Sequence, residues 1–251
     1  GNVACLGQAL QENQKDLPTW RGHHEQNMAL TGIAYSRAKR RRQIFIATSS
    51  VGPGATNMVT AAAVAMSNRL PILFFPGDSF ANRIPDPVLQ QIENFNNPTI
   101  TANDAFKPVT RYFDRITRPE QIISSLPQAI HTMLDPADCG PACISLCQDV
   151  QGEKFDYPED FFKETVHIIR RPKPDDYQIK EAAELIKKSK KPIIISGGGV
   201  FYSDAMSELS QFAKKHNVPV TQTIMGYSTM KKDHSHYVGA IGGLGGKAAN
   251  N

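Results

Sequence analysis

A glutamate at the start of a predicted helix is the first residue of this sequence that could do chemistry. Glu25 lies in the segment Arg21-Gly-His-His-Glu-Gln26, which we expect to follow a strand and to open a helix. The helix dipole favours the ionised form of a carboxylate in the first turn. The segment therefore indicates either a helix-start carboxylate, which contributes a few tenths of a kcal/mol to stability, or a group that exchanges a proton with a ligand.

A glycine-containing turn between a predicted strand and a predicted buried helix is the second candidate. It reads Thr48-Ser-Ser-Val-Gly-Pro-Gly-Ala-Thr-Asn57. Glycines let a ligand approach the backbone closely, and free N–H groups at a helix start can bind an anion or the polar edge of a ring. The turn has neither the Gly-Lys-Ser/Thr of a P-loop nor the G-x-G-x-x-G order of a dinucleotide loop. It indicates a ligand loop or a simple strand-to-helix turn.

Weaker candidates follow further along the chain. Asp78 in Gly77-Asp-Ser-Phe80 and Asp86 in Pro85-Asp-Pro-Val-Leu-Gln-Gln91 follow a predicted strand, and loops at the carboxyl ends of parallel strands often bind ligands. Both aspartates could equally be turn residues. The glycine-rich segment 239–247 departs from a P-loop at two positions. His234 and His236 have no carboxylate or cysteine pattern beside them, so we interpret them as loop residues.

Composition and charge exclude several classes of protein. The net charge of +4 and the 40% of hydrophobic residues are ordinary for a globular protein, and no apolar run reaches membrane-spanning length. The basic cluster at 37–42 has no aromatic stacking platform, so we expect no nucleic-acid partner. Cys139, Cys143 and Cys147 have the spacing of neither a zinc ribbon nor a common iron–sulfur run. We expect them to be buried thiols in a cytoplasmic protein.

Alternating strands and helices must position these residues. Apolar runs predict parallel strands at 43–48, 71–75, 143–150, 192–196 and 218–222. Helical patterns occupy 25–42, 55–68, 119–134, 177–189 and 203–217. The alternation predicts an α/β fold with a parallel sheet, which we expect to have six strands in the first unit, with the first element missing.

A polar segment divides the chain into two predicted domains. We place the first at 1–152, a linker at 153–175 that closes with Arg170-Arg-Pro-Lys-Pro174, and the second at 176–251. Residues before prolines are driven towards extended geometry, which is typical of a linker. Because the sequence opens on Gly1 and the second unit looks unfinished at Asn251, we expect a fragment cut at both ends.

Two of these motifs together resemble the pyrimidine-binding domain of thiamine-diphosphate-dependent enzymes of the acetolactate synthase-like family. They are His24-Glu-Gln26 and the segment 47–57, in that order, followed by an apolar helix and the strand Leu70-Pro-Ile-Leu-Phe74. The resemblance covers essentially the whole chain. It implies a thiamine-diphosphate-binding (pyrimidine) domain with a parallel sheet, followed by part of a Rossmann-like central domain. It also implies thiamine diphosphate and Mg²⁺ as cofactors, and a homodimer or higher homo-oligomer.

The resemblance implies roles for individual residues. Glu25 matches the family's catalytic glutamate, which hydrogen-bonds the aminopyrimidine ring of the cofactor and drives its activation. Pro53, Gly54 and Asn57 match the loop that lines the pyrimidine side. Gln90 matches a family glutamine near the reacting centre.

The sequence also departs from the family pattern. A Gly-Asp-Gly stretch with a later Asn, which holds diphosphate and magnesium in the family, has no counterpart here, because Gly77-Asp-Ser79 lies in the wrong place. We therefore expect the diphosphate-binding domain and the metal site to lie outside this sequence. Since the family's active site forms between two subunits, we expect these 251 residues alone to be inactive.

Three further segments narrow the resemblance within the family. They are 85–91, 103–120 and 148–153, and they resemble members that open an inositol-derived cyclic dione with water by cleaving a C–C bond. This implies a small-molecule cyclic dione as the substrate. The alternatives are an acetolactate synthase-like or other thiamine-diphosphate lyase or decarboxylase, and a non-catalytic α/β binding module that would tolerate replacement of Glu25.

Overall fold

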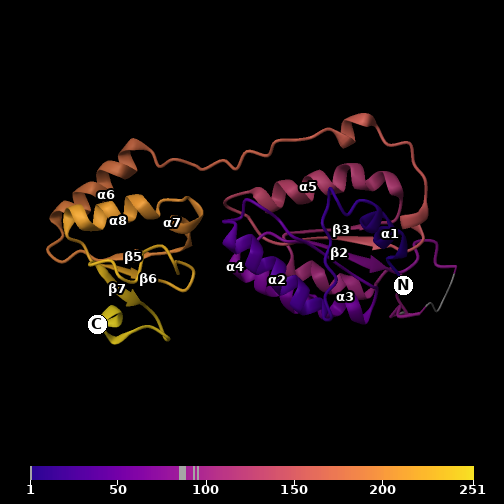
Figure 1. Cartoon of the computed structure of the whole chain (residues 1–251), viewed down its shortest axis with the longest axis horizontal. Helices are drawn as coiled ribbons and strands as arrows, with labels where there is room; N and C mark the ends of the chain where they lie inside the picture. Colours follow the sequence, from indigo (N-terminus) through magenta and orange to yellow (C-terminus); the bar gives the residue numbers. More distant parts are fainter. Residues whose placement is uncertain (1, 85–88, 93, 95) are drawn as a thin grey trace. The chain divides into compact units, whose positions relative to one another are not determined.

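Two compact α/β units make up the chain. The computed structural model describes residues 2–84, 89–92, 94 and 96–251, and they divide into units at 1–170 and 171–251. Each unit is built on its own parallel sheet (Figure 1), which confirms the predicted α/β fold class. The finer domain limits expected around 153–175 stay a prediction.

The sheet of the first unit has the strand order β1-β2-β4-β3, with every neighbouring pair parallel. The strands are β1 (Ile46–Ser49), β2 (Leu73–Asp78), β3 (Tyr112–Ile116) and β4 (Ala142–Cys147). Strands β2 and β4 are central and almost entirely buried, as their continuous apolar sequences predict. The expectation of six strands is wrong for the described part of this unit, whose sheet is 4-stranded.

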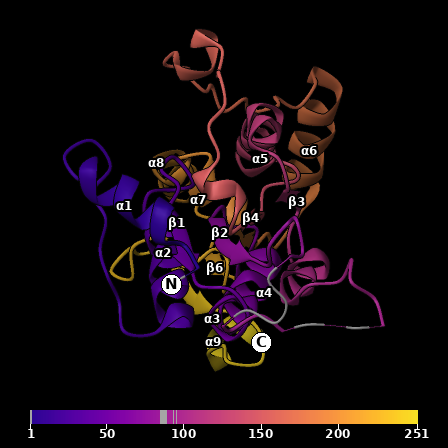
Figure 2. The same ribbon diagram turned by 90° about the vertical axis from the view of Figure 1, so that its right-hand side faces the viewer.

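Helices cover both faces of this sheet. Both views show the sheet between α5 (Ile122–Leu134) on one face and α4 (Val59–Asn68) on the other (Figures 1 and 2). Helix α2 (Glu25–Ala38) packs against α4 and β1. On the α5 face the core is built from buried residues, which include Leu73, Ile116, Ala129, Met133 and Ile144. This packing fixes the positions of the carboxyl ends of the strands, from which loops with polar residues begin.

The segment before Glu25 and the end of α2 both differ from the sequence-based expectation. Helix α1 (Ala4–Glu12) and turns precede Glu25, so the strand expected there is wrong. The connecting segment carries Trp20, which is 72% exposed and stacks on Phe45 rather than joining a sheet. Helix α2 ends at Ala38 rather than at residue 42, because Arg40 and Arg41 adopt φ values of 54° and 64°, outside the right-handed helical region.

Shorter elements interrupt two predicted helices. The expected helix at 55–68 is divided into α3 (Pro53–Asn57) and α4, which meet at Met58. The helix expected from 119 begins as the 3₁₀ turn η2 (Pro119–Gln121) before α5. Further 3₁₀ helices are η1 (Ala102–Val109), η3 (Val150–Gly152) and η4 (Glu159–Phe162).

The second unit has a 3-stranded parallel sheet in the order β5-β6-β7. Its elements are α6 (Asp176–Lys188), β5 (Ile194–Ser196), α7 (Gly198–Tyr202), α8 (Met206–His216), β6 (Val220–Gln222), β7 (Tyr237–Ala240) and α9 (Lys247–Asn250). Helix α6 begins with a capping box between Asp175 and Gln178. A core around Ala213, Val220 and Met230 joins the helices to the sheet. Among the described residues of either unit, no helix has the length and hydrophobicity needed to cross a membrane.

Candidate functional site

The carboxyl end of β1 and the first turn of α2 bring the predicted site residues together. Glu25 is the first residue of α2, and His24 caps the helix by accepting a hydrogen bond on Nδ1 from the backbone N–H of Asn27 at 3.4 Å. Strand β1 ends at Ser49 and α3 begins at Pro53. The tight turn between them places α3 against the start of α2.

Asn57, the last residue of α3, holds the Glu25 carboxylate. Its Nδ2 donates a hydrogen bond to Glu25 Oε2 at 2.8 Å and lies 3.4 Å from His24 Nε2. This bond from Asn57, helped by the backbone N–H of Glu25 itself, outweighs burial and holds the pKa of Glu25 below its ordinary value. The carboxyl group is therefore ionised at neutral pH.

An open pocket of about 490 Å³ lies in front of this pair. It is lined by Glu25, Ser50, Pro53, Gly54, Thr56, Asn57 and Gln90. The five residues to which the family resemblance gives a role thus line one pocket, which we call the Glu25 pocket, although their individual roles stay predictions. Ser50 and Thr56 were not singled out, and the only signal for them is their place in the segment 47–57.

Two glycines let the backbone approach these side chains closely. A Cβ atom at Gly54 would lie 2.6 Å from Ser50 Oγ and 3.6 Å from Glu25 Oε1. Gly52 has a φ of +67°, and a Cβ atom there would lie 1.9 Å from the carbonyl oxygen of Gln90. Glycine at these positions keeps the floor of the pocket free of side chains and seats Gln90 at its edge.

The other sequence candidates do not line the Glu25 pocket. Asp78 is fully buried and accepts hydrogen bonds from Arg115 Nε and from the backbone N–H of Ser79, each at 2.8 Å. Asp86 lies outside the described residues. His236 Nε2 is 2.9 Å from Asn217 Oδ1 in the second unit. Across the described chain, no group of three or more His, Cys, Asp or Glu residues could hold a metal ion.

The predicted buried cysteines are confirmed as core residues. Cys139, Cys143 and Cys147 are free thiols at 2% exposure or less. Burial raises the pKa of Cys139 to about 11 and that of Cys147 to about 12. These thiols are therefore protonated and unreactive at neutral pH.

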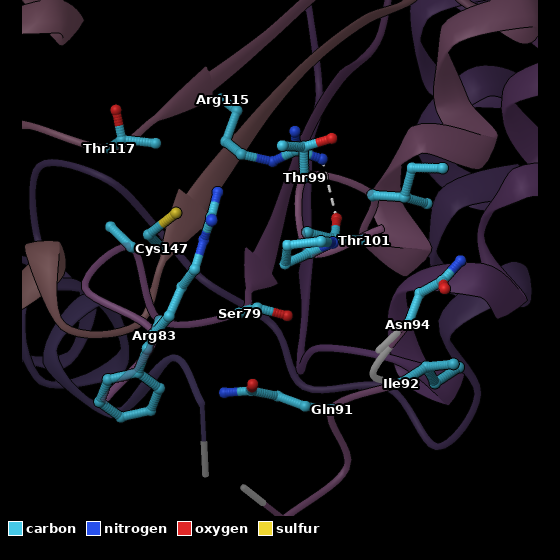
Figure 3. A pocket seen from close by; sticks show the side chains of 14 residues that line it. Ser79, Arg83, Gln91, Ile92, Asn94, Thr99, Thr101, Arg115, Thr117 and Cys147 are labelled. Atoms are coloured by element: carbon cyan, nitrogen blue, oxygen red, sulfur yellow. Dashed lines mark hydrogen bonds between the residues drawn. The ribbon is translucent and has the colours of Figure 1, made fainter. Parts of the chain in front are cut away.

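A second pocket, of about 380 Å³, lies over the carboxyl ends of β2, β3 and β4 (Figure 3). We call it the second pocket; its polar lining includes Ser79, Arg83, Gln91, Thr99, Arg115 and Thr117. The weaker sequence candidates 77–80 and 85–91 contribute Ser79, Phe80 and Gln91 to it. Sequence reasoning missed the rest of the lining, because Arg83, Arg115 and the threonines come from separate loops and form no motif.

The loop after β2, which forms one wall of the second pocket, is fixed through its backbone. Both oxygens of the Asp149 carboxylate accept hydrogen bonds from this loop. Ala81 N–H donates at 2.8 Å and Asn82 N–H at 3.0 Å. Asn82 Oδ1 accepts a further bond from the Ile84 N–H at 2.8 Å. Arg83 is thereby held at the pocket.

Comparisons with known proteins agree on one family. Residues 2–97 match the model of the thiamine pyrophosphate enzyme N-terminal TPP-binding domain, and residues 179–251 match that of the thiamine pyrophosphate enzyme central domain. Similar relatives are proteins named 3D-(3,5/4)-trihydroxycyclohexane-1,2-dione hydrolase. The one from Clostridium tetani is 50% identical and the one from Bacillus subtilis is 49% identical, each over 250 residues. Each alignment covers 100% of this chain, which spans 39% of the relative's length.

Proposed function

The chain belongs to the thiamine pyrophosphate enzyme family, and from this premise we propose that it is part of a thiamine-diphosphate-dependent hydrolase that cleaves a C–C bond of trihydroxycyclohexane-1,2-dione. The observation that carries the proposal is identity of about 50% along the whole chain to relatives of that name. Addition of one water across the bond between the two carbonyl carbons opens the ring to a chain that ends in an aldehyde and a carboxylic acid. The proposed product is 5-deoxyglucuronate, in the breakdown of myo-inositol.

The residues of the Glu25 pocket fit the pyrimidine half of thiamine diphosphate. A flat aminopyrimidine needs a carboxyl group for a ring nitrogen and a wall without side chains. Glu25 supplies the first, and the close backbone at Gly54 supplies the second. When bound, thiamine diphosphate supplies the carbanion chemistry that amino-acid side chains lack.

We propose a task for five residues of the pocket. Glu25 holds and transfers a proton at its carboxyl group, and Asn57 fixes the orientation of that group through Oε2. We assign Pro53 and Gly54 to the lining of the pyrimidine and Gln90 to the substrate side of the pocket.

We place the diphosphate and Mg²⁺ sites outside these residues, because the sequence lacks the family's Gly-Asp-Gly stretch. We also propose a cytoplasmic homo-oligomer as the working enzyme, since the family's site is completed by a second subunit.

Replacement of Glu25 by Gln in the full-length protein tests the function. With thiamine diphosphate and magnesium present, ring opening of the dione should fall by about a hundredfold or more, the range that general acid–base groups supply. Glu12→Gln is the matched control, because Glu12 is exposed at the end of α1.

The outcomes separate the alternatives. Unchanged ring opening in Glu25→Gln would contradict the role of this carboxylate, whereas absence of turnover in the wild-type protein would favour a non-catalytic binding module. A wild-type protein that leaves the dione intact but decarboxylates pyruvate would agree with the family and show that the proposed substrate is wrong.

A further inference from the structure

The second pocket is lined by Arg83, an exposed side chain for which the described residues supply no carboxylate partner. Arg115 is neutralised, because its Nε lies 2.8 Å from Asp78 Oδ2 and its Nη2 lies 2.8 Å from Asp104 Oδ1. Arg83 differs: within the part of the chain that the structure describes, no carboxylate forms an ion pair with it, and both Asp149 oxygens face backbone N–H groups. Figure 3 shows the Arg83 side chain running along the pocket with its guanidinium directed towards Arg115. An anion bound in the second pocket would neutralise the positive charge of Arg83.

A side-chain amide without a hydrogen-bond acceptor is a second, independent indication of a ligand in this pocket. Gln91 Nε2 is buried and has no hydrogen-bond partner among the described residues. Buried polar atoms are rarely left in this state, because the loss of hydration is not compensated. Gln91 lies across the pocket from Arg115 (Figure 3). A carboxylate is an acceptor that both an arginine and an amide N–H can bind.

The remaining lining fits a polyhydroxylated carbon chain. Ser79, Thr99 and Thr117 present hydroxyl groups, each of which can donate and accept a hydrogen bond. Ile92 and Ile100 offer apolar surface to the carbon skeleton. A volume of about 380 Å³ accommodates a small ligand rather than a macromolecule.

We propose that the second pocket binds an open-chain polyhydroxylated carboxylate, a sugar acid, through Arg83 and Gln91. This inference rests on the proposed function, since hydrolysis of the cyclic dione yields an acid of this class. Gln90 lines the Glu25 pocket and its neighbour Gln91 lines the second pocket. The segment 89–92 therefore borders both, and the second pocket is a site for the product next to the site of reaction.

Equilibrium dialysis of the full-length protein with radiolabelled D-glucuronate tests the site. We expect saturable binding that weakens at least about tenfold in Arg83→Gln, which removes the positive charge of the guanidinium, and, separately, in Gln91→Leu, which removes the amide donor. Arg118→Gln is the matched control: it removes an equal charge from an exposed arginine that pairs with Glu120 outside the pocket. It should leave the affinity unchanged, and so should Glu25→Gln.

Three results would overturn the site. These are equal affinity in wild type and Arg83→Gln, equal binding of uncharged myo-inositol, and a loss in Glu25→Gln as large as that in Arg83→Gln. The last would place glucuronate in the Glu25 pocket. The proposed function is tested separately. A protein that binds glucuronate through Arg83 but does not open the dione would support the second pocket as a binding site and refute the proposed reaction. Ring opening without glucuronate binding would support the reaction and refute the binding site.

Discussion

At the scale of single residues, the hydrogen bond from Asn57 lowers the pKa of the Glu25 carboxyl group. The bond is 2.8 Å long and is the largest influence on that group, whose pKa lies below its ordinary value. The Glu25 carboxyl group, which we propose to exchange a proton with a ligand, is ionised before any ligand binds. Ligand binding through a protonated Glu25 would therefore take up a proton near neutral pH.

Asn57→Leu should raise the pKa of Glu25 towards its ordinary value, because the variant removes the donor that stabilises the carboxylate. A ¹³C NMR titration of the glutamate side chains measures this. Thr56→Val is the control, since Thr56 lines the same pocket but donates its hydroxyl hydrogen bond to Pro53 O. Equal Glu25 titration in wild type and Asn57→Leu would refute the assignment.

The same bond has a defined effect on stability. Because folding lowers the pKa of Glu25, its contribution is present above the unfolded-state pKa and is lost as the pH falls through the folded-state pKa. The stability difference between wild type and Asn57→Leu should accordingly shrink on acidification.

At the scale of elements, the turn between β1 and α3 depends on the absence of a side chain at position 52. Its φ of +67° is strained for any other residue, and its neighbour is the backbone carbonyl of Gln90 rather than a flexible side chain. The turn and the segment 89–92 therefore form one backbone contact, which also shapes the edge of the Glu25 pocket.

Gly52→Ala should destabilise the first unit by about 1–3 kcal/mol, the cost of a residue held in an unfavourable backbone region, with more added by the clash. Urea unfolding followed by fluorescence reports on this unit, because Trp20 is the only tryptophan. Gly7→Ala is the control: it lies in α1 with nothing within 4 Å of an added Cβ, and alanine favours a helix. A Gly52→Ala variant as stable as wild type would show that the turn tolerates a side chain.

At the scale of the whole molecule, an exposed segment joins two units that each have their own sheet. Residues 164–175 have no regular secondary structure and are exposed except at Ile169. Backbone in this state is readily cleaved by proteases, whereas packed sheets resist.

Brief trypsin treatment should cut first after Lys163 and Arg170, because the bonds after Arg171 and Lys173 precede prolines. Mass spectrometry should then find two resistant fragments, one for each unit. Lys163→Gln combined with Arg170→Gln should delay the cleavage. Early cuts inside β3 after Arg115, with this segment intact, would contradict the two-unit architecture.

The sequence predicted the elements whose patterns are strong and missed those whose residues are mixed. Strands β2 and β4 are central and read as apolar runs, whereas the edge strand β3 carries Asp114 and Arg115 and buries only Ile116. Strand β7 is half-buried along its length, and Gly239 in it has a φ of +113°. Periodicity reports burial, so partly exposed strands give little signal.

The two pockets differ in the same way. Glu25 and the segment 47–57 lie in order along the chain, so the resemblance could place them together before their geometry was known. The second pocket depends on tertiary contacts: it draws Arg83, Gln91 and Arg115 from loops that have no common pattern. Only the folded chain brings these residues to one cavity.

The hydrogen bonds from the loop after β2 to Asp149 determine which positions of this loop can be substituted without loss of its anchoring. The carboxylate binds the N–H groups of Ala81 and Asn82 and touches neither side chain through those bonds. Substitution of the exposed Arg83 in this loop would therefore leave both bonds in place, while loss of the acid at position 149 would remove them. During evolution, the side chains of this wall can change while the backbone path of the loop is conserved.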